Sequence, residues 1–152
     1  MDGRRLKDPE TWSPPLSVAI TIASRVPSAV LKVAPGLDRA LRPDGATFEA
    51  VSVSGDLVEV ALRLGDARAD APFAAILLPS GRTMAGDGTT PPHVGPWSTW
   101  VLEPDDAVIR AGLITDLATE LDASLVDPQV AYLTCGTEPP RDLRYARFEV
   151  DA

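Results

Sequence analysis

The chain has 152 residues, of which 45% are apolar and 24% charged, an ordinary composition for a globular protein of one or two small domains. It contains no apolar run of the roughly 20 residues that a membrane-spanning helix needs, and residues 1–15 are not followed by the apolar core of a secretory signal. Its single cysteine, Cys135, and single histidine, His93, exclude an internal disulfide and a zinc site built from these residue types. We therefore expect a cytoplasmic protein.

The formal net charge of −8 is unevenly distributed along the chain. Residues 1–45 carry seven basic and five acidic side chains, whereas residues 46–152 carry seven basic and seventeen acidic ones. Because nucleic-acid phosphates are bound mainly by Lys and Arg, the acidic part argues against autonomous RNA or DNA binding. Any such contact is expected near Arg4, Arg5 and Lys7, which otherwise form an ordinary solvated terminus.

The first half predicts one helix and several strands joined by short turns. The apolar run over 29–34 is closed by Pro35-Gly36, which favours a buried strand forming half of a βαβ unit with the helix before it. Apolar residues alternate over 57–64 after a glycine-containing turn, which is typical of a β-hairpin. The expected elements are a helix over 16–25, strands over 29–34, 47–53, 57–64 and 73–78, and a helical turn over 37–42.

The second half begins with a linker over 85–96, which has three glycines and three prolines in twelve positions. A helix is predicted over 105–122, because large apolar residues recur every fourth position from Ile109 to Leu121. Asp105 and Asp106 would lie at the positive end of its dipole. Strands are predicted over 99–102, 130–134 and 143–150.

Residues that could carry chemistry are few. Gly86-Asp87-Gly88 is followed by Thr-Thr-Pro-Pro instead of the helix that a phosphate-binding loop requires. His93 lies in the linker, Cys135 is interpreted as a small apolar residue, and the paired aspartates are explained by the helix dipole. No nucleophile and base form a recognisable pair, so no catalytic, cofactor-binding or metal-binding residue is predicted.

Three tryptophans lie in positions that suggest contacts. Trp12 precedes Ser13-Pro14-Pro15, and an aromatic residue before a rigid loop can line a substrate pocket or pack on its own core. Trp97 and Trp100 lie at the end of the linker, where we expect them to hold two domains together instead of stacking on a base.

Several segments together resemble a known family. They are GRRLKDPETWSPPL (3–16), AVLKVAPGLDRAL (29–41), VSVSGDLVEVAL (51–62) and WVLEPDDAVIRAGLITDLATELDASLVDPQVAYLT (100–134). They are similar to the C-terminal part of bacterial class I S-adenosylmethionine-dependent methyltransferases that carry a THUMP-like domain after the catalytic domain. The EPDDAVIRAG and DPQVAYLT segments are the most specific parts of the resemblance.

The resemblance implies an α/β and α+β fold in two parts. Residues 1–84 would be the C-terminal remnant of a Rossmann-like methyltransferase sheet, 85–96 a Pro/Gly linker and 97–152 a small α+β THUMP-like domain. The family's cofactor-binding loops would precede Met1, so no cofactor is expected for this chain alone, and S-adenosylmethionine only with the missing N-terminal half. Arg4 and Arg5 match a basic stretch of the family's catalytic loop and, with Trp12, are the substrate-binding candidates.

Two functions follow as hypotheses. The first is a methyltransferase portion that is inactive alone and pairs with the missing N-terminal half, or self-associates through an exposed sheet edge. The second is a non-enzymatic THUMP-like module that binds protein or RNA. Residues 97–152 contain four basic and eleven acidic side chains, a balance that does not support RNA binding.

Overall fold

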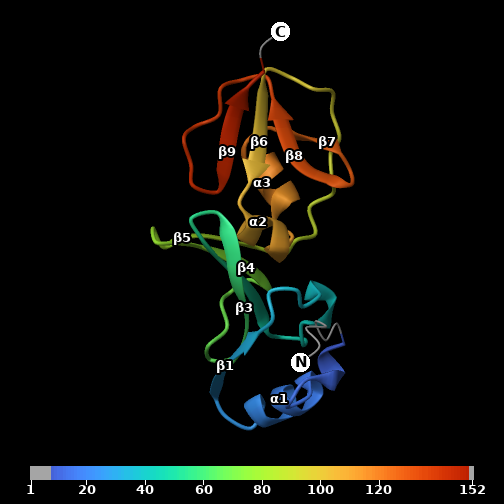
Figure 1. Ribbon diagram of the computed structural model, residues 1–152, viewed down its shortest axis with the longest axis vertical. Helices are drawn as coiled ribbons and strands as arrows, with labels where there is room; N and C mark the ends of the chain where they lie inside the picture. Colours follow the sequence, from blue (N-terminus) through green and yellow to red (C-terminus); the bar gives the residue numbers. More distant parts are fainter. Residues whose placement is uncertain (1–7, 151–152) are drawn as a thin grey trace, which may run out of the picture.

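The computed structural model describes residues 8–150, which form two β-sheets with short helices between and beside them (Figure 1). None of the helices in this part of the chain is long and apolar enough to cross a membrane. The elements in chain order are η1 (Pro9–Thr11), α1 (Leu16–Ala23), β1 (Ser28–Val33), η2 (Arg39–Leu41), β2 (Thr47–Val53), β3 (Asp56–Gly65), β4 (Phe73–Leu78), β5 (Arg82–Gly86), β6 (Trp100–Pro104), α2 (Asp106–Ala111), α3 (Ile114–Glu120), β7 (Ser124–Asp127), β8 (Val130–Cys135) and β9 (Tyr145–Glu149).

The larger sheet has the strand order β1-β3-β2-β4-β5. Only β2 and β4 are parallel neighbours, and the other pairs are antiparallel, so β1, β2 and β4 all run in the same direction. The predicted hairpin is confirmed as β2 and β3. Its two connecting residues, Ser54 and Gly55, both have positive φ angles, of 55° and 99°, as a tight hairpin turn requires.

The predicted strand over 29–34 exists as β1, but the expectation that it is buried is wrong. It is an edge strand whose one neighbour, β3, is antiparallel, and exposed positions alternate along it. Val33 is buried, whereas Val30 is 57% exposed. Helix α1 packs against this strand. The strand has apolar residues on both faces, but only one face is covered.

The smaller sheet has the order β7-β8-β6-β9, with every pair antiparallel. Two short strands were not predicted. β5 begins before the proposed linker and overlaps only its first two residues, 85 and 86; Met84 is the one buried residue in this strand. β7 follows α3 after a short turn. A single bridge between Val94 and Leu125 joins the rest of the linker to β7.

The prediction of one continuous helix over 105–122 is wrong, because the chain breaks at Gly112. This glycine caps α2 with a φ of 72°, and α3 begins two residues later. A Cβ atom at Gly112 would lie 1.7 Å from the Arg39 Nη1 atom. The apolar spacing that suggested one helix is therefore shared between two short helices.

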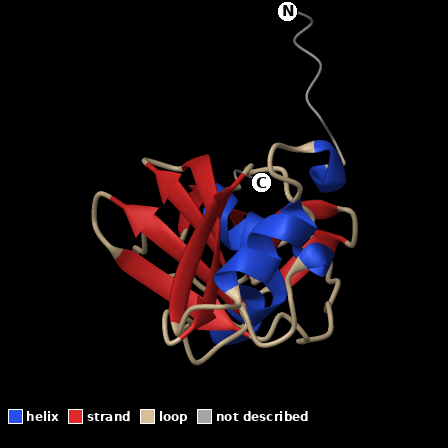
Figure 2. Ribbon diagram, turned by 90° about the horizontal axis from the view of Figure 1, so that it is seen from below, coloured by secondary structure: helices blue, strands red, loops and turns tan. Residues whose placement is uncertain are grey.

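Both sheets contribute to one continuous cluster of buried apolar residues. Helix α2 packs on β2, β3 and β4 of the larger sheet, and α3 packs on β7 of the smaller one. Figure 1 shows α2 at the level where the two sheets meet, with α1 at the far end of the larger sheet. Figure 2 looks along the long axis of Figure 1 from below, so helices that Figure 1 places at different levels overlap in it.

The break at Gly112 can be tested by adding a single methyl group. We expect Gly112→Ala to lower the free energy of unfolding by at least about 1–2 kcal/mol, because a left-handed φ is unfavourable for alanine and the methyl group meets Arg39. Gly36→Ala is the matched control, since its Cβ would have no atom within 4 Å and its φ is not positive. Urea denaturation of both variants measures the difference, and equal midpoints would contradict this account.

Candidate functional site

A large cleft lies where the larger sheet meets the smaller one. It has a volume of about 830 Å³ and is formed by the carboxyl ends of β2 and β4, the residues that lead into α2 and the start of β9. Five of its lining residues are acidic and none is Lys or Arg, while leucines and prolines supply its apolar surface. The acidic residues are Asp56, Glu103, Asp105, Asp106 and Asp142.

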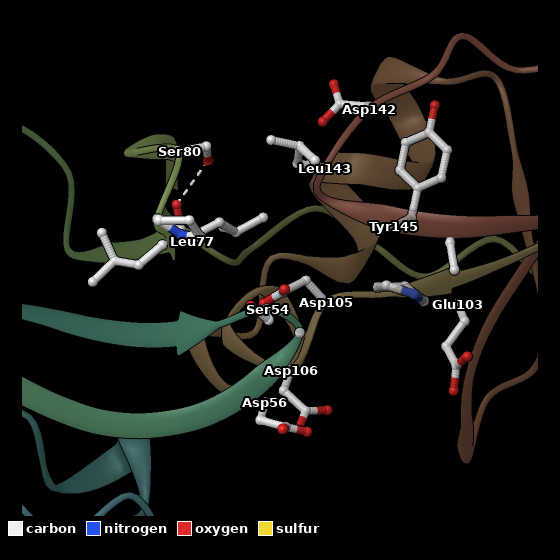
Figure 3. A pocket seen from close by; sticks show the side chains of 15 residues that line it. Ser54, Asp56, Leu77, Ser80, Glu103, Asp105, Asp106, Asp142, Leu143 and Tyr145 are labelled. Atoms are coloured by element: carbon white, nitrogen blue, oxygen red, sulfur yellow. Dashed lines mark hydrogen bonds between the residues drawn. The ribbon is translucent and has the colours of Figure 1, made fainter.

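The carboxylates on the α2 side of the cleft have structural partners. Asp105 is buried and caps α2 by accepting a hydrogen bond of 2.8 Å from the amide of Ala107, as the helix-start interpretation predicts. Asp106 accepts a weak hydrogen bond of 3.4 Å from the amide of Leu57. Figure 3 shows Asp106 beside Asp56 on one wall and Asp142 on the other. Within residues 8–150, no group of three or more His, Cys, Asp or Glu side chains is placed to hold a metal ion.

The opposite wall is held by a buried arginine. The Arg144 guanidinium donates hydrogen bonds of 2.6 and 2.8 Å to the two carboxylate oxygens of Glu120. It also contacts Asp142 at 2.7 Å, and Arg82 reaches the same carboxylate at 3.1 Å. This network explains why Asp142 can line a cleft while remaining paired.

The network shifts the pKa values of its members. The hydrogen bonds that Arg144 donates to Glu120, and then those to Asp142, raise the pKa of Arg144 above its ordinary value. The hydrogen bond from Arg144 lowers the pKa of Glu120. Burial acts to raise the pKa of Asp142, but the hydrogen bonds and positive charge of Arg144 outweigh it, so this pKa is lowered. All three groups stay charged at neutral pH.

Tyr145 is the cleft residue whose pKa is raised. Burial is the main cause, and the charge of Asp142 adds to it. Its hydroxyl donates a hydrogen bond of 2.6 Å to the carbonyl of Pro140, so its proton is already engaged. Ser80 likewise donates to the carbonyl of Leu77. The cleft therefore has the character of a binding surface, with no activated nucleophile among its lining residues.

The substrate-binding candidates from the sequence lie elsewhere. Arg4 and Arg5 are outside the described residues. Trp12 follows η1, is half-buried and packs against the core cluster, and it does not line the cleft. Its role in substrate binding stays a prediction.

The remaining residues that the sequence singled out have separate environments. His93 is exposed, and its backbone carbonyl accepts a hydrogen bond from Leu125. Cys135 is buried, which raises the pKa of its thiol. Trp100 is half-buried beneath the Arg147 guanidinium, whereas Trp97 is 65% exposed. The expectation that Trp97 holds two domains together is therefore wrong, because its side chain faces solvent.

Removing the charge of Asp142 tests how much the network around Arg144 contributes to stability. Asp142→Asn should lower the free energy of unfolding by about 1.5–3 kcal/mol at neutral pH, because the buried Arg144 loses one charged partner. A lowered pKa means that the stabilisation is present above the ordinary value of 3.8 and is lost as the pH falls through the folded-state value.

Thermal unfolding from neutral to acid pH measures both effects. The wild type should lose stability below about pH 4, and Asp142→Asn should lose less over the same range. Asp70→Asn is the control, since Asp70 is exposed and has no partner among the described residues. Parallel pH profiles for all three proteins would show that the network does not contribute to stability.

No family model matches the chain. It is similar to two uncharacterized S-adenosylmethionine-dependent methyltransferases from Mycobacterium tuberculosis, of strains CDC 1551 / Oshkosh and ATCC 25618 / H37Rv. Each is 34% identical over 116 residues, which covers 73% of this chain and 32% of the relative. The match thus spans about a third of the length of these relatives.

A solved structure has a similar fold. The crystal structure of a protein from Porphyromonas gingivalis W83 named "putative methyltransferase" matches 92% of this chain and 39% of its own, with a TM-score of 0.65 and 19% identity. Because the match covers nearly all of the present chain, it includes both of the chain's sheets. This chain is therefore homologous, over part of their length, to proteins named as S-adenosylmethionine-dependent methyltransferases, and its fold matches part of the Porphyromonas gingivalis structure.

Proposed function

We propose that this chain is the C-terminal portion of an S-adenosylmethionine-dependent methyltransferase and that the cofactor-binding portion lies outside these residues. The observation that carries the proposal is the edge of β1 that pairs with no strand within residues 8–150, combined with matches that leave about two thirds of each relative unaccounted for. In this proposal residues 1–84 belong to the catalytic sheet, 85–96 are a linker, and 97–152 form a THUMP-like domain.

The connection between α1 and β1 supports this assignment. β3 occupies one edge of β1, and α1 packs against β1 from the preceding segment of the chain. A parallel strand that preceded α1 would join β1 at its free edge through a right-handed crossover. The exposed side chain of Val30 lies on this edge strand, and Val18 and Ile22 add exposed apolar surface on α1.

The described residues do not fit S-adenosylmethionine by themselves. A nucleotide-type cofactor needs a glycine-rich turn between a strand and a helix, with free amide groups at the helix start. The one strand that leads straight into an α-helix here is β6, and the α2 amide of Ala107 is already bound by the Asp105 carboxylate. We therefore assign this chain no part of the methyl-transfer step, and Arg4, Arg5 and Trp12 remain its substrate-binding candidates.

Calorimetric titration tests the proposal. S-adenosylmethionine added to the 152-residue chain alone should give no binding heat. The same titration with the remaining two thirds of a mycobacterial relative, supplied as a separate chain, should give binding together with a stable complex. Binding to the isolated chain would contradict the proposal, and so would a failure of the two portions to associate.

A surface variant tests whether the second portion associates at β1, the proposed joint, without altering the stability of the isolated chain. Val30→Lys should leave the melting temperature of the isolated chain nearly unchanged, because Val30 is 57% exposed. It should weaken association with the second portion, because it places a charge on the proposed joint. Val58→Lys is the matched control, since Val58 is 46% exposed on β3 within the same sheet. Equal association of both variants would show that β1 is not the joint.

A non-enzymatic THUMP-like module that binds protein or RNA is the second candidate. The observation that favours it is the continuous core, because a chain that buries one apolar cluster across both sheets can be stable without a partner. This candidate predicts a monodisperse chain that ignores both S-adenosylmethionine and the second portion of the relative. Sedimentation velocity alongside the calorimetry distinguishes the two.

A further inference from the structure

A second groove lies between helix α2 and the segment that follows β1. It has a volume of about 520 Å³ and is lined by Gly36, Asp38, Arg39, Ile109 and Arg110. Its walls are the loop that follows β1 and the carboxyl-terminal half of α2. It differs from the acidic cleft in both position and charge, because it shares no lining residue with that cleft.

The Arg39 guanidinium is held in place by its surroundings. It lies 5.2 Å from the centre of the Phe73 ring, and its Nη1 atom donates to the carbonyl of Gly112 at 3.4 Å. Gly88 and Gly112 leave the space that it occupies, since a Cβ on either would lie within 3 Å of it. A guanidinium has five N–H donors, and this one uses a single long bond, so its remaining donors are oriented and free for a ligand.

Other cationic side chains surround Arg39. Arg42 stacks on the same Phe73 ring at 5.3 Å, and Arg110 lines the groove. Arg110 makes no side-chain hydrogen bond or ion pair with any residue in 8–150, and neither Arg39 nor Arg42 has a carboxylate partner there. Asp38 is the lining carboxylate, and it accepts a hydrogen bond of 2.9 Å from the amide of Ala40. None of these three arginines therefore forms an ion pair within residues 8–150.

We propose that this groove binds the phosphate group of an anionic ligand, with Arg39 as the fixed donor and Arg110 as the second cation. Guanidinium groups bind phosphate oxygens with charge-assisted, often bidentate hydrogen bonds. The groove also begins at Gly36, just beyond the carboxyl end of β1. This site goes beyond the proposed function, and its test needs no methyl transfer.

Direct titration of the intact 152-residue chain tests the site. Inorganic pyrophosphate followed by nitrogen-15 NMR should shift the backbone amides of residues 36–40 and 109–112 before any others. Arg110→Ala should weaken binding about tenfold, since a hydrogen bond to a charged group is lost. It should not unfold the chain, because Arg110 has no partner to lose. Arg141→Ala is the matched control, an exposed arginine without a partner outside the groove.

A second variant tests whether the guanidinium of Arg39, and not only its charge, binds the ligand. Arg39→Lys keeps the charge but loses the planar donor, so it should also weaken pyrophosphate binding while retaining the folded NMR spectrum. A short single-stranded RNA in a parallel titration identifies the source of the phosphate. Binding tighter than pyrophosphate points to a polynucleotide backbone, and weaker binding points to a small phosphorylated molecule. No shift with either probe, or equal losses in Arg110→Ala and Arg141→Ala, would overturn the proposal.

Discussion

The left-handed turn at Gly112 determines how one short stretch of chain packs on two sheets. Gly112 adopts a left-handed conformation and leaves the space that the Arg39 side chain fills. The break lets α2 pack on β2 and β4 while α3 packs on β7. A continuous helix would run straight, so it could not follow both packing directions within so few residues. The common core therefore depends on a glycine that the apolar pattern does not mark.

Helix α2 also lies between an acidic surface at its amino end and a basic groove at its carboxyl end. Asp105 and Asp106 at its amino end face the acidic cleft, where the cap and the helix dipole favour negative charge. Arg110 in its last turn lines the second groove together with Arg39. Two surfaces of opposite charge are thus presented by one helix of six residues. An acidic composition overall does not prevent a locally basic groove.

Local patterns predicted the elements that depend on local forces. The hairpin of β2 and β3 and the bounds of β4 follow from alternation and turn residues. The position of β1 at the sheet edge depends on which strand pairs with it, which an apolar run cannot reveal. The short strands β5 and β7 form through pairing with β4 and β8, and their own sequences carry little signal. The same limit applies to the sites, because Arg39 meets Arg110, and Arg144 meets Glu120, only through the tertiary fold.

The free edge of β1 links the fold to the proposed function. Hydrogen exchange of its backbone amides, followed by mass spectrometry, tests that link most directly. In the isolated chain, the β1 amides that do not bond to β3 should exchange rapidly. Adding the remaining portion of a mycobacterial relative should slow their exchange, while the amides of β9, on the other sheet, keep their rates. Unchanged exchange in β1, with a complex demonstrably formed, would contradict the account.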